Sequence, residues 1–555
     1  MKRLLALALS ACLLFAFGAQ AETLTGTAKG FGEDGVTVTV TVEGGKITKV
    51  EAVGPSETQG IGTPALEQLP ALIVAAGNTQ VDVVAGATYT SKAILKAVEI
   101  AMGLQPAEVA ATEAPAVPVE VTAADAYIGF GMLASGRLGP GKDDKDVPVY
   151  SVNEVYIDAI FDKDGKILYT HLDQLEYATP NYDGAGMPHF SGFPGQGGYN
   201  YDENHDAKVD SVTEVNDDSF LAEIASLLTK RQRGDEYKMN TGTWSDQANK
   251  YEQIFVGKTV AEIEEWFAKY TSDRNGRPLK DGSTDEADAA KYTALTAEDK
   301  AILADVTTAA TMSLNDAHGN ILGALKKAYE NRQPLTVNAA SFGFGLNNSG
   351  RIGPGKDDKD VPVYSINQVY ATSLFDAEGR LTYLYIDQLE VATPNYDGAS
   401  MPHFSGFPGQ IPYNYDENHD AKVDTTLTAT DDSFLAEVGG WLTKRERGAD
   451  YTMGIGTWSD QANKYQQLFV GKTVAEIEEW FAKYTSDSNG RPLKDGSTNE
   501  ADAAKYAALS AEDKAILADV TTTATMSTKD GHGDILAAIR ASYENRLPLE
   551  LKLSK

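Results

Sequence analysis

The sequence predicts an α+β protein in which small antiparallel sheets pack against helices. The clearest strand signal is VTVTVTV at residues 36–42, which alternates strictly between apolar and polar side chains. Gly44 and Gly45 then turn the chain into a second strand, KITKVEAV, at residues 46–53. Apolar residues recur at helical spacing further on, at Ile94, Val98, Ala101 and Met102. A hairpin followed by an amphipathic helix is therefore the expected local unit.

The larger part of the chain consists of two copies of one sequence unit, separated by a constant offset of 214 residues. The run VGKTVAEIEEWFAKYTSD occurs at residues 256–273 and again at 470–487. Runs of this length indicate a tandem domain duplication and not a short-period solenoid. We predict a first unit over residues 22–104, an Ala/Pro-rich linker over 105–122, and two enlarged repeats over 123–334 and 335–555.

Each repeat begins and ends like the first unit, with a large insertion between. In the first copy a strand, VNEVYIDAIF, precedes a turn at Asp164 and Gly165, and the strand KILYTHLDQL follows. The insertion is helical, because Thr259 and Glu262 form a capping box ahead of an amphipathic run. A hydroxyl-rich segment and a final helix close the repeat. The hairpin-and-helix unit is thus expected three times.

The N-terminal residues 1–21 are typical of a secretory signal peptide. The basic residues Lys2 and Arg3 precede an apolar stretch and an Ala-Gln-Ala cleavage pattern. We therefore expect an exported protein, located in the periplasm or at the cell surface. An alternative interpretation takes residues 9–12 as a lipobox, which would make Cys12 a lipidated N-terminus and the protein membrane-associated.

The composition excludes several kinds of site. Cys12 is the single cysteine, so the mature chain is expected to have no disulfide, zinc thiolate site, iron–sulfur cluster or c-type haem. The 555 residues carry a formal net charge of −32. Such an acidic chain argues against nucleic acid and anionic membranes as partners.

The segment DVVAGATYTS at residues 82–91 is a small-residue turn that leads directly into a helix. Thr88 and Thr90 lie at the mouth of this helix. Unpaired backbone N–H groups and the helix dipole favour a phosphate at such a position. Related segments, DVTTAATMS at 305–313 and DVTTTATMS at 519–527, predict two further phosphate sites.

Residues 22–104 resemble the FMN-binding domain of the C subunit of sodium-pumping NADH:quinone reductase and of the G subunit of Rnf complexes. The resemblance rests on the hairpin residues 45–47, on ETQGIG at 57–62 and on 82–91. In that family a flavin transferase esterifies the last hydroxyl of the motif with FMN, which implies a covalent phosphoester at Thr90. The two large repeats resemble extracellular flavoproteins of surface electron-transfer chains. This second resemblance implies three FMN-binding-type domains in tandem, with further acceptors at Ser313 and Ser527.

The turn before the acceptor differs among the three segments. In the first unit Gly86 allows a close backbone approach and Ala87 keeps the site open. Ala309 and Thr523 replace the glycine in the repeats. If the turn requires a positive φ, a β-branched threonine at residue 523 is unfavourable.

Other positions of the motif are retained. Thr311 and Thr525 align with Thr88, and three aspartates stand at one offset before the acceptors, namely Asp82, Asp305 and Asp519. These aspartates either orient the loop or hold a metal ion during flavin transfer. An alternative interpretation is a helix N-cap cluster, in which Ser, Thr and Asp are favoured without any flavin.

The segment DENHDAKVD, at residues 202–210 and 416–424, spaces oxygen-bearing side chains as an EF-hand loop does. Ala207 replaces the usual glycine at position six, and Thr213 replaces the bidentate glutamate at position twelve. The pattern fits either a weak calcium site or an acidic surface turn. The candidate ligands are Asp202, Asn204, Asp206 and Asp210, and in the second copy Asp416, Asn418, Asp420 and Asp424.

Two further segments have a structural and a functional interpretation. The glycine-rich loop at residues 180–196 predicts a surface loop anchored by phenylalanines, or else a wall for the flavin ring. The basic segment TKRQRG at residues 229–234 predicts the solvated last turn of a helix.

Together these features predict an exported electron carrier with one to three covalently bound FMN groups. No acid/base or nucleophilic triad is visible, which favours an electron-transfer flavoprotein over a complete oxidoreductase. The expected partners are a flavin transferase for maturation and a membrane quinol or NADH dehydrogenase system as electron donor. The alternative is a calcium-dependent surface binding protein with flavin only in its first domain.

Overall fold

The computed structural model divides into two compact units, residues 1–110 and 111–555. The predicted signal peptide, with Cys12, lies outside the described residues. Among the described residues no helix has both the length and the apolar character needed to cross a membrane. The described residues are 22–28, 35–43, 46–56, 62–79, 81, 88–102, 119–184, 186–234, 237–239, 241–315, 318–398 and 400–553.

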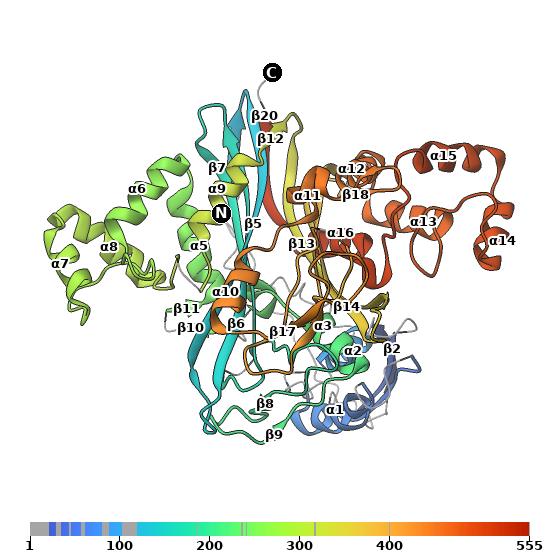
Figure 1. The fold of residues 1–555 in the computed structure, drawn as a ribbon, viewed down its shortest axis with the longest axis horizontal. Helices are drawn as coiled ribbons and strands as arrows, with labels where there is room; N and C mark the ends of the chain where they lie inside the picture. The colour runs from blue at the N-terminus through green and yellow to red at the C-terminus, as the bar shows by residue number, and fades with distance from the viewer. Residues whose placement is uncertain are drawn as a thin grey trace, which may run out of the picture. The chain divides into compact units, whose positions relative to one another are not determined.

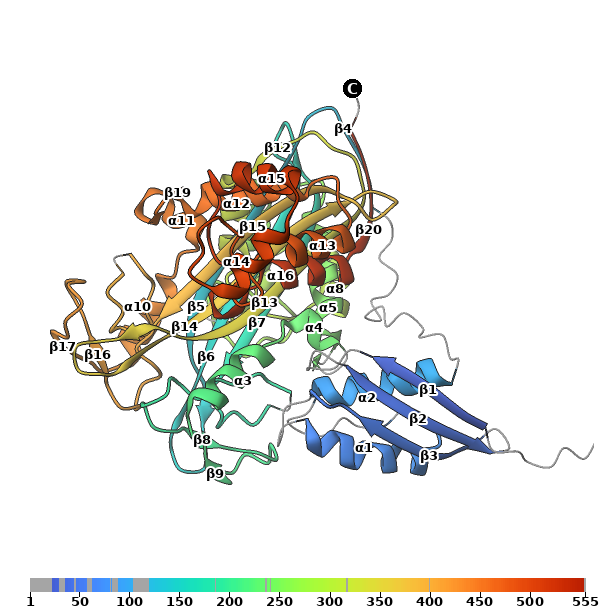
Figure 2. The same ribbon diagram turned by 90° about the vertical axis from the view of Figure 1, so that its right-hand side faces the viewer.

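The first unit is a three-stranded antiparallel sheet covered by two helices (Figure 2). Its core forms where the alternating apolar residues of the middle strand, such as Val38 and Val40, meet Ile94 of the closing helix. Gly26 allows that helix to cross the first strand closely, since a Cβ there would lie 2.1 Å from the carbonyl oxygen of Ala97. The elements are β1 (Glu22–Ala28), β2 (Val36–Glu43), β3 (Lys46–Val53), α1 (Thr63–Ala76) and α2 (Thr88–Ala101).

The second unit contains both repeats, and each contributes a sheet of long antiparallel strands. The first sheet has the order β12-β5-β6-β7 and the second the order β15-β14-β13-β20-β4. The last strand, β4, is parallel to β20 and includes residues 119–122 of the predicted linker. The strands are β4 (Val119–Ala123), β5 (Ala126–Lys142), β6 (Pro148–Asp162), β7 (Ile167–Ala178), β12 (Gln333–Leu335), β13 (Ala339–Lys356), β14 (Pro362–Phe375), β15 (Leu381–Ala392) and β20 (Leu547–Leu553).

The two sheets lie side by side in the middle of this unit and share one core (Figure 1). Across it, the rings of Tyr156 and Tyr370 have centroids 5.2 Å apart. Reciprocal hydrogen bonds cross the same boundary, since Tyr150 donates to Asp431 at 2.9 Å and its copy in the second repeat donates to Asp217 at 2.8 Å. The repeats therefore form a single body with approximate twofold symmetry.

Helices cover the outer faces of the two sheets (Figure 1). The closing helices α9 (Ile321–Glu330) and α16 (Ile535–Glu544) lie on β5–β6 and β13–β14, as α2 lies on β1–β2. The predicted capping box is confirmed, because Thr259 and Glu262 bond each other's backbone N–H. The insertion helices are α5 (Trp244–Phe255), α6 (Val260–Tyr270), α7 (Glu286–Ala294) and α8 (Ala297–Ala309), with copies α12 (Trp458–Phe469), α13 (Val474–Tyr484), α14 (Glu500–Ala508) and α15 (Ala511–Thr521).

Shorter elements connect the sheets to these helices. The remaining helices are α3 (Asp217–Ser226), α4 (Lys230–Arg233), α10 (Asp431–Gly439) and α11 (Lys444–Arg447), with the 3-10 turns η2 (Gly448–Asp450) and η3 (Asp530–His532). The short strands are β8 (Asn200–Tyr201), β9 (Ser211–Val212), β10 (Lys238–Met239), β11 (Gly242–Thr243), β16 (Tyr413–Tyr415), β17 (Thr425–Leu427), β18 (Thr452–Met453) and β19 (Gly456–Thr457). The predicted α+β class is confirmed.

Two acids of β6 are buried in the shared core, and this makes stability depend on pH. Burial raises the pKa of Asp158 to about 8 and that of Glu154 to about 7. Both pKa values exceed the unfolded ones of about 4. The folded state therefore holds extra protons, and its stability is full below about pH 4 and falls as the pH rises toward 8.

We expect Asp158→Asn to flatten this pH dependence. The native chain should lose stability of the order of a few kcal/mol between pH 5 and pH 8, and the variant should lose distinctly less. Urea unfolding at both pH values measures the change. An unchanged pH slope in the variant would show that Asp158 is not protonated in the folded chain.

Candidate functional site

The predicted phosphate site of the first unit is only partly described. Helix α2 begins at Thr88, as the sequence predicts, and Thr90 lies in its first turn. The first N–H groups of a helix have no acceptor within the helix. Thr90 and Ser91 are both buried. Asp82, Gly86 and Ala87, and the side chain of Thr88, lie outside the described residues.

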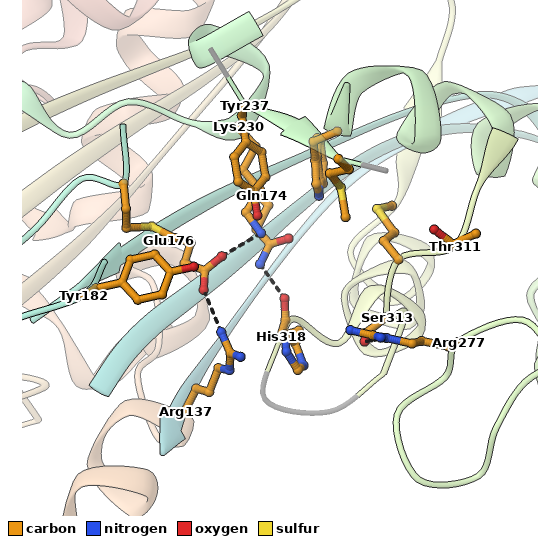
Figure 3. Close-up of a pocket in the computed structure, with 14 residues that line it drawn as sticks. Arg137, Gln174, Glu176, Tyr182, Lys230, Tyr237, Arg277, Thr311, Ser313 and His318 are labelled. Carbon is orange, nitrogen blue, oxygen red and sulfur yellow. Dashed lines mark hydrogen bonds and ion pairs between the residues drawn. The ribbon is translucent and has the colours of Figure 1, made fainter. Parts of the chain in front are cut away.

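In the first repeat, a pocket lies beside the predicted acceptor Ser313 (Figure 3). Its cavity volume is about 170 Å³. This volume is below the range of about 300–1,000 Å³ that is usual for small-molecule sites, so the pocket encloses only part of a nucleotide-sized ligand. We call it the first site. It is lined by Arg137, Gln174, Glu176, Tyr182, Met187, Lys230, Tyr237, Met239, Trp244, Arg277, Thr311, Met312, Ser313 and His318.

An arginine contacts the acceptor hydroxyl directly. The Nε of Arg277 donates a hydrogen bond to the Oγ of Ser313 at 3.0 Å. Figure 3 shows the guanidinium lying against this serine. Arginine has five N–H donors in a planar fork that matches phosphate oxygens. A phosphoester formed at Ser313 would therefore have a cation and several donors beside it.

A buried glutamine fixes the backbone that carries the acceptor. The backbone N–H groups of Thr311 and Met312 both donate to Oε1 of Gln247, at 2.8 and 2.9 Å. Gln247 comes from α5 and its side chain is fully buried. The segment before Ser313 is thus held by a side chain of α5 and not by the N-terminus of a helix.

A buried ion network forms a second cationic wall. Lys230 Nζ lies 2.8 Å from Glu176 Oε2, and Arg137 Nη1 lies 3.4 Å from Glu176 Oε1. Burial alone would raise the pKa of Glu176, but Lys230 and Arg137 outweigh it and hold this pKa below its usual value. One carboxylate faces two cations, so together with Arg277 the wall carries excess positive charge in a chain of net charge −32.

Aromatic rings supply the apolar part of the lining. The Lys230 ammonium lies 5.8 Å from the Trp244 ring centroid and 5.4 Å from that of Tyr237. Tyr182 lines the pocket from the glycine-rich loop. Aromatic faces and neighbouring methionines favour a flat heterocyclic ligand. The first site therefore combines flat apolar surfaces with cationic donors.

The second repeat retains this set of residues. Every lining residue of the first site has the same residue type 214 positions later, and we call these copies the second site. The key contacts recur: Arg491 Nε donates to Ser527 Oγ at 2.9 Å, and Lys444 lies 2.8 Å from Glu390. By contrast the buried strands β6 and β14 differ in residue type at Val152, Glu154, Ile157, Asp158, Ala159 and Ile160.

In the two repeats, the proposed acceptor serines do not lie at the N-terminus of a helix. The prediction of a helix N-terminus at Ser313 and Ser527 is therefore wrong. Helix α9 has ten residues against fourteen in α2, and it begins only at Ile321. The turn that carries Thr90 in the first unit is replaced by the loop that Gln247 holds. Thr523 has no positive φ, so the expected strain is absent as well.

Asp305 and Asp519 do not orient the acceptor loops. They lie inside α8 and α15, where neighbouring apolar residues such as Val306 are buried in the core. Their side chains are exposed and form ion pairs with Lys250 at 2.7 Å and Lys464 at 2.6 Å. The Asp/Thr run is typical of a helix start, but here it forms the last turns of a helix.

The basic segment is also not solvated. Thr229 caps the short helix α4, and Lys230 and Arg233 are both buried. The pairing of Lys230 with Glu176 explains this burial, because a paired charge is less unfavourable in the interior. The glycine-rich loop has a mixed role: Phe190 and Phe193 anchor it in the shared core, while Tyr182 reaches the pocket.

In the candidate calcium loops, aspartate side chains accept hydrogen bonds from backbone N–H groups of the same loop. Asp202 accepts hydrogen bonds from the N–H groups of Asp206 and Ala207 at 3.0 and 2.9 Å. Ala207 takes a φ of 64°, the left-handed shape for which such loops usually have glycine. In the described part of the chain, no group of three or more His, Cys, Asp or Glu side chains could hold a metal ion. Calcium binding stays a prediction.

A cationic and aromatic pocket suits a flat ligand that carries an anionic group. In comparison with known proteins, residues 30–103 of the chain match the model of the FMN-binding domain family. The chain therefore contains an FMN-binding domain.

Two curated relatives are similar to parts of the chain. A chlorophenol reductase of Desulfitobacterium hafniense is 35% identical over 222 residues, which cover 38% of this chain and 59% of the relative. A urocanate reductase of Eggerthella lenta is 40% identical over 87 residues, which cover 16% of this chain and 14% of the relative. The chain thus spans less than two thirds of either relative.

Proposed function

We propose that this protein is an exported electron carrier that holds FMN covalently at Thr90, Ser313 and Ser527. The first unit supports the proposal through its match to the FMN-binding domain family, and Thr90 is the last hydroxyl of its motif. The observation that carries it for the repeats is the hydrogen bond from Arg277 to Ser313, with its copy from Arg491 to Ser527.

The residues of both sites fit FMN. The acceptor serine offers the oxygen for a phosphoester, and the arginine beside it offers donors for the phosphate. The aromatic and methionine side chains offer surfaces for the ring system. Local positive charge in an otherwise acidic chain matches the negative charge of the cofactor, and it favours the reduced state, in which that charge increases.

A carrier function fits these sites better than substrate turnover does. Bound FMN accepts and returns one or two electrons, while the protein holds the cofactor and sets its environment. Lys230 lies 2.8 Å and Arg137 lies 3.4 Å from the carboxylate of Glu176, an arrangement suited to binding and orienting an anionic cofactor. Covalent attachment would also keep the cofactor from being lost outside the cytoplasm.

The partners follow from this proposal. Maturation needs a flavin transferase. A membrane quinol or an NADH dehydrogenase system would supply electrons, and the protein would work in the periplasm or at the cell surface. The net charge of −32 supports an acidic, soluble carrier and disfavours nucleic acid.

A spectroscopic experiment tests the carrier function. The chain is co-produced with a flavin transferase, denatured and desalted, and its flavin absorbance is recorded. We expect absorbance that stays with the protein, and in the native protein this absorbance should bleach on reduction and return on reoxidation. Flavin that is lost on denaturation would contradict covalent attachment, and flavin that cannot be reversibly reduced would contradict a carrier.

A further inference from the structure

The two repeats meet through faces that are copies of each other, so residues near the twofold axis contact their own copies. The ring of Phe130 stacks on that of Phe344 with centroids 6.2 Å apart, and Tyr156 lies against Tyr370. The two members of each pair are 214 positions apart in the sequence. Such an interface is isologous. At its axis, a difference between the repeats distinguishes an unlike pairing of faces from a like pairing.

At two positions near this axis, an acid of the first repeat faces a neutral copy of itself. Asp158 of β6 accepts a hydrogen bond from the hydroxyl of its copy, Thr372 of β14, at 2.5 Å. The copy of Glu154 is Gln368. Burial raises the pKa of Glu154 to about 7, and hydrogen bonds from Tyr156 and Gln368 oppose this rise. The two acids and their two neutral copies are all buried.

The titratable groups next to the two acids are neutral near pH 7. His171 of β7 lies opposite Asp158 in the strand register, and burial and the nearby Arg231 lower the pKa of His171 well below its usual value. Burial also raises the pKa of Tyr383, which interacts with Asp158. Three tyrosines that interact with Glu154 have pKa values raised by burial, namely Tyr156, Tyr177 and Tyr370. These neighbours offer no positive charge to a second carboxylate.

Like pairings of these faces would differ sharply in their polar contacts. Two first-repeat faces would bring one Asp158 against another and one Glu154 against another. Carboxyl groups that share a buried place cannot both ionise, so each must take up a proton or meet a like charge. Two second-repeat faces would bring together only hydroxyls and amides, which can hydrogen-bond to each other. The two acids therefore oppose the pairing of a first repeat with another first repeat.

We propose that Asp158 and Glu154 make the inner face of the first repeat, the face of β5–β7 in the shared core, selective for the face of the second repeat. The partner that fits is a copy of the same face with neutral side chains at these two positions, and the chain supplies it itself. The first repeat of another copy of the chain is rejected. Unfavourable contacts with a wrong partner are a usual source of such selectivity. This inference goes beyond the proposed function and does not depend on bound flavin.

A like pair can be created inside the full chain. Thr372→Asp places a second carboxyl against Asp158, as two first-repeat faces would. Urea unfolding of this variant and of the native chain is measured at pH 4.5 and at pH 7. The added acid must stay protonated in the folded chain but ionises in the unfolded one. We expect the ratio of the two unfolding equilibrium constants, variant over native, to rise by at least about a hundredfold between these pH values.

An exchange of the two residues should restore the fold. Asp158→Thr combined with Thr372→Asp again places one acid against one hydroxyl, and its unfolding equilibrium constant at pH 7 should return to within about tenfold of the native value. Thr372→Asn is the matched control, because asparagine has the shape of aspartate without its charge, and it should show no such pH-dependent loss. Gln368→Glu, with and without Glu154→Gln, should repeat the pattern at the second pair.

The exchanged variant keeps the test decisive even if Thr372→Asp does not fold at pH 7. Recovery in the exchanged variant would support the inference, and an exchanged variant as unstable as Thr372→Asp would overturn it. Native-like unfolding of Thr372→Asp at both pH values would also overturn it. An equal pH-dependent loss in Thr372→Asn would do the same, since the cause would then not be a second carboxyl. None of these results bears on flavin attachment.

Discussion

Replacing Arg277 by alanine will remove most of the flavin from Ser313 while Ser527 keeps its own. The variant loses the charged donor that lies 3.0 Å from the acceptor oxygen. Hydrogen bonds to charged groups contribute about 1.5–3 kcal/mol, so attachment at Ser313 should slow by about ten- to a hundredfold. Peptide mass mapping after a fixed time of co-production measures the occupancy of each acceptor.

The second site provides the control for this experiment. Arg491→Ala should empty Ser527 and spare Ser313, and Arg277→Lys should restore part of the occupancy, because lysine keeps the charge but loses the planar fork. Full occupancy of Ser313 in Arg277→Ala would contradict a role for this arginine. Loss of flavin from both acceptors would indicate general unfolding instead of a local effect.

Replacing Lys230 by methionine will destabilise the second unit strongly. Glu176 is buried, and among the described residues its remaining Lys/Arg ion-pair partner would be Arg137, at 3.4 Å. Removing one partner of a buried ion pair commonly lowers the free energy of unfolding by about 3–5 kcal/mol. Urea unfolding of the full chain at neutral pH measures this loss.

A double variant distinguishes the buried charge from lost packing. Lys230→Met combined with Glu176→Gln leaves no unpaired carboxylate, so most of the stability should return. If the double variant is as unstable as the single one, packing of the lysine chain against Trp244 is the main contribution. A single variant as stable as the native chain would contradict the burial of this pair.

Local patterns in the sequence predict the elements of this fold well. The alternation of β2 and the capping box at Thr259 depend on neighbouring residues, and both are found in the structure. The sharing of one core by two repeats depends on contacts such as Tyr156 with Tyr370, which are far apart in sequence. Neither the spacing of apolar residues nor the helix-capping motifs in the sequence indicate such contacts.

The candidate site was only partly predictable for the same reason. Motif alignment pointed to Ser313 as an acceptor, and this serine lines the pocket, but the alignment gave the wrong local setting, because Asp and Thr occur at both ends of helices. Arg277 comes to the serine from a loop 36 positions earlier in the sequence. The sequence predicted that Lys230 is exposed to solvent, because its ion-pair partner Glu176 lies on a strand that is far away in the sequence.

The most direct test is the intact mass of the chain after co-production with a flavin transferase. We expect three FMN additions in the native chain and two in each of Thr90→Ala, Ser313→Ala and Ser527→Ala. The triple variant should carry none. A native chain with a single addition that disappears only in Thr90→Ala would contradict the account, since the two sites in the repeats would then hold no covalent flavin.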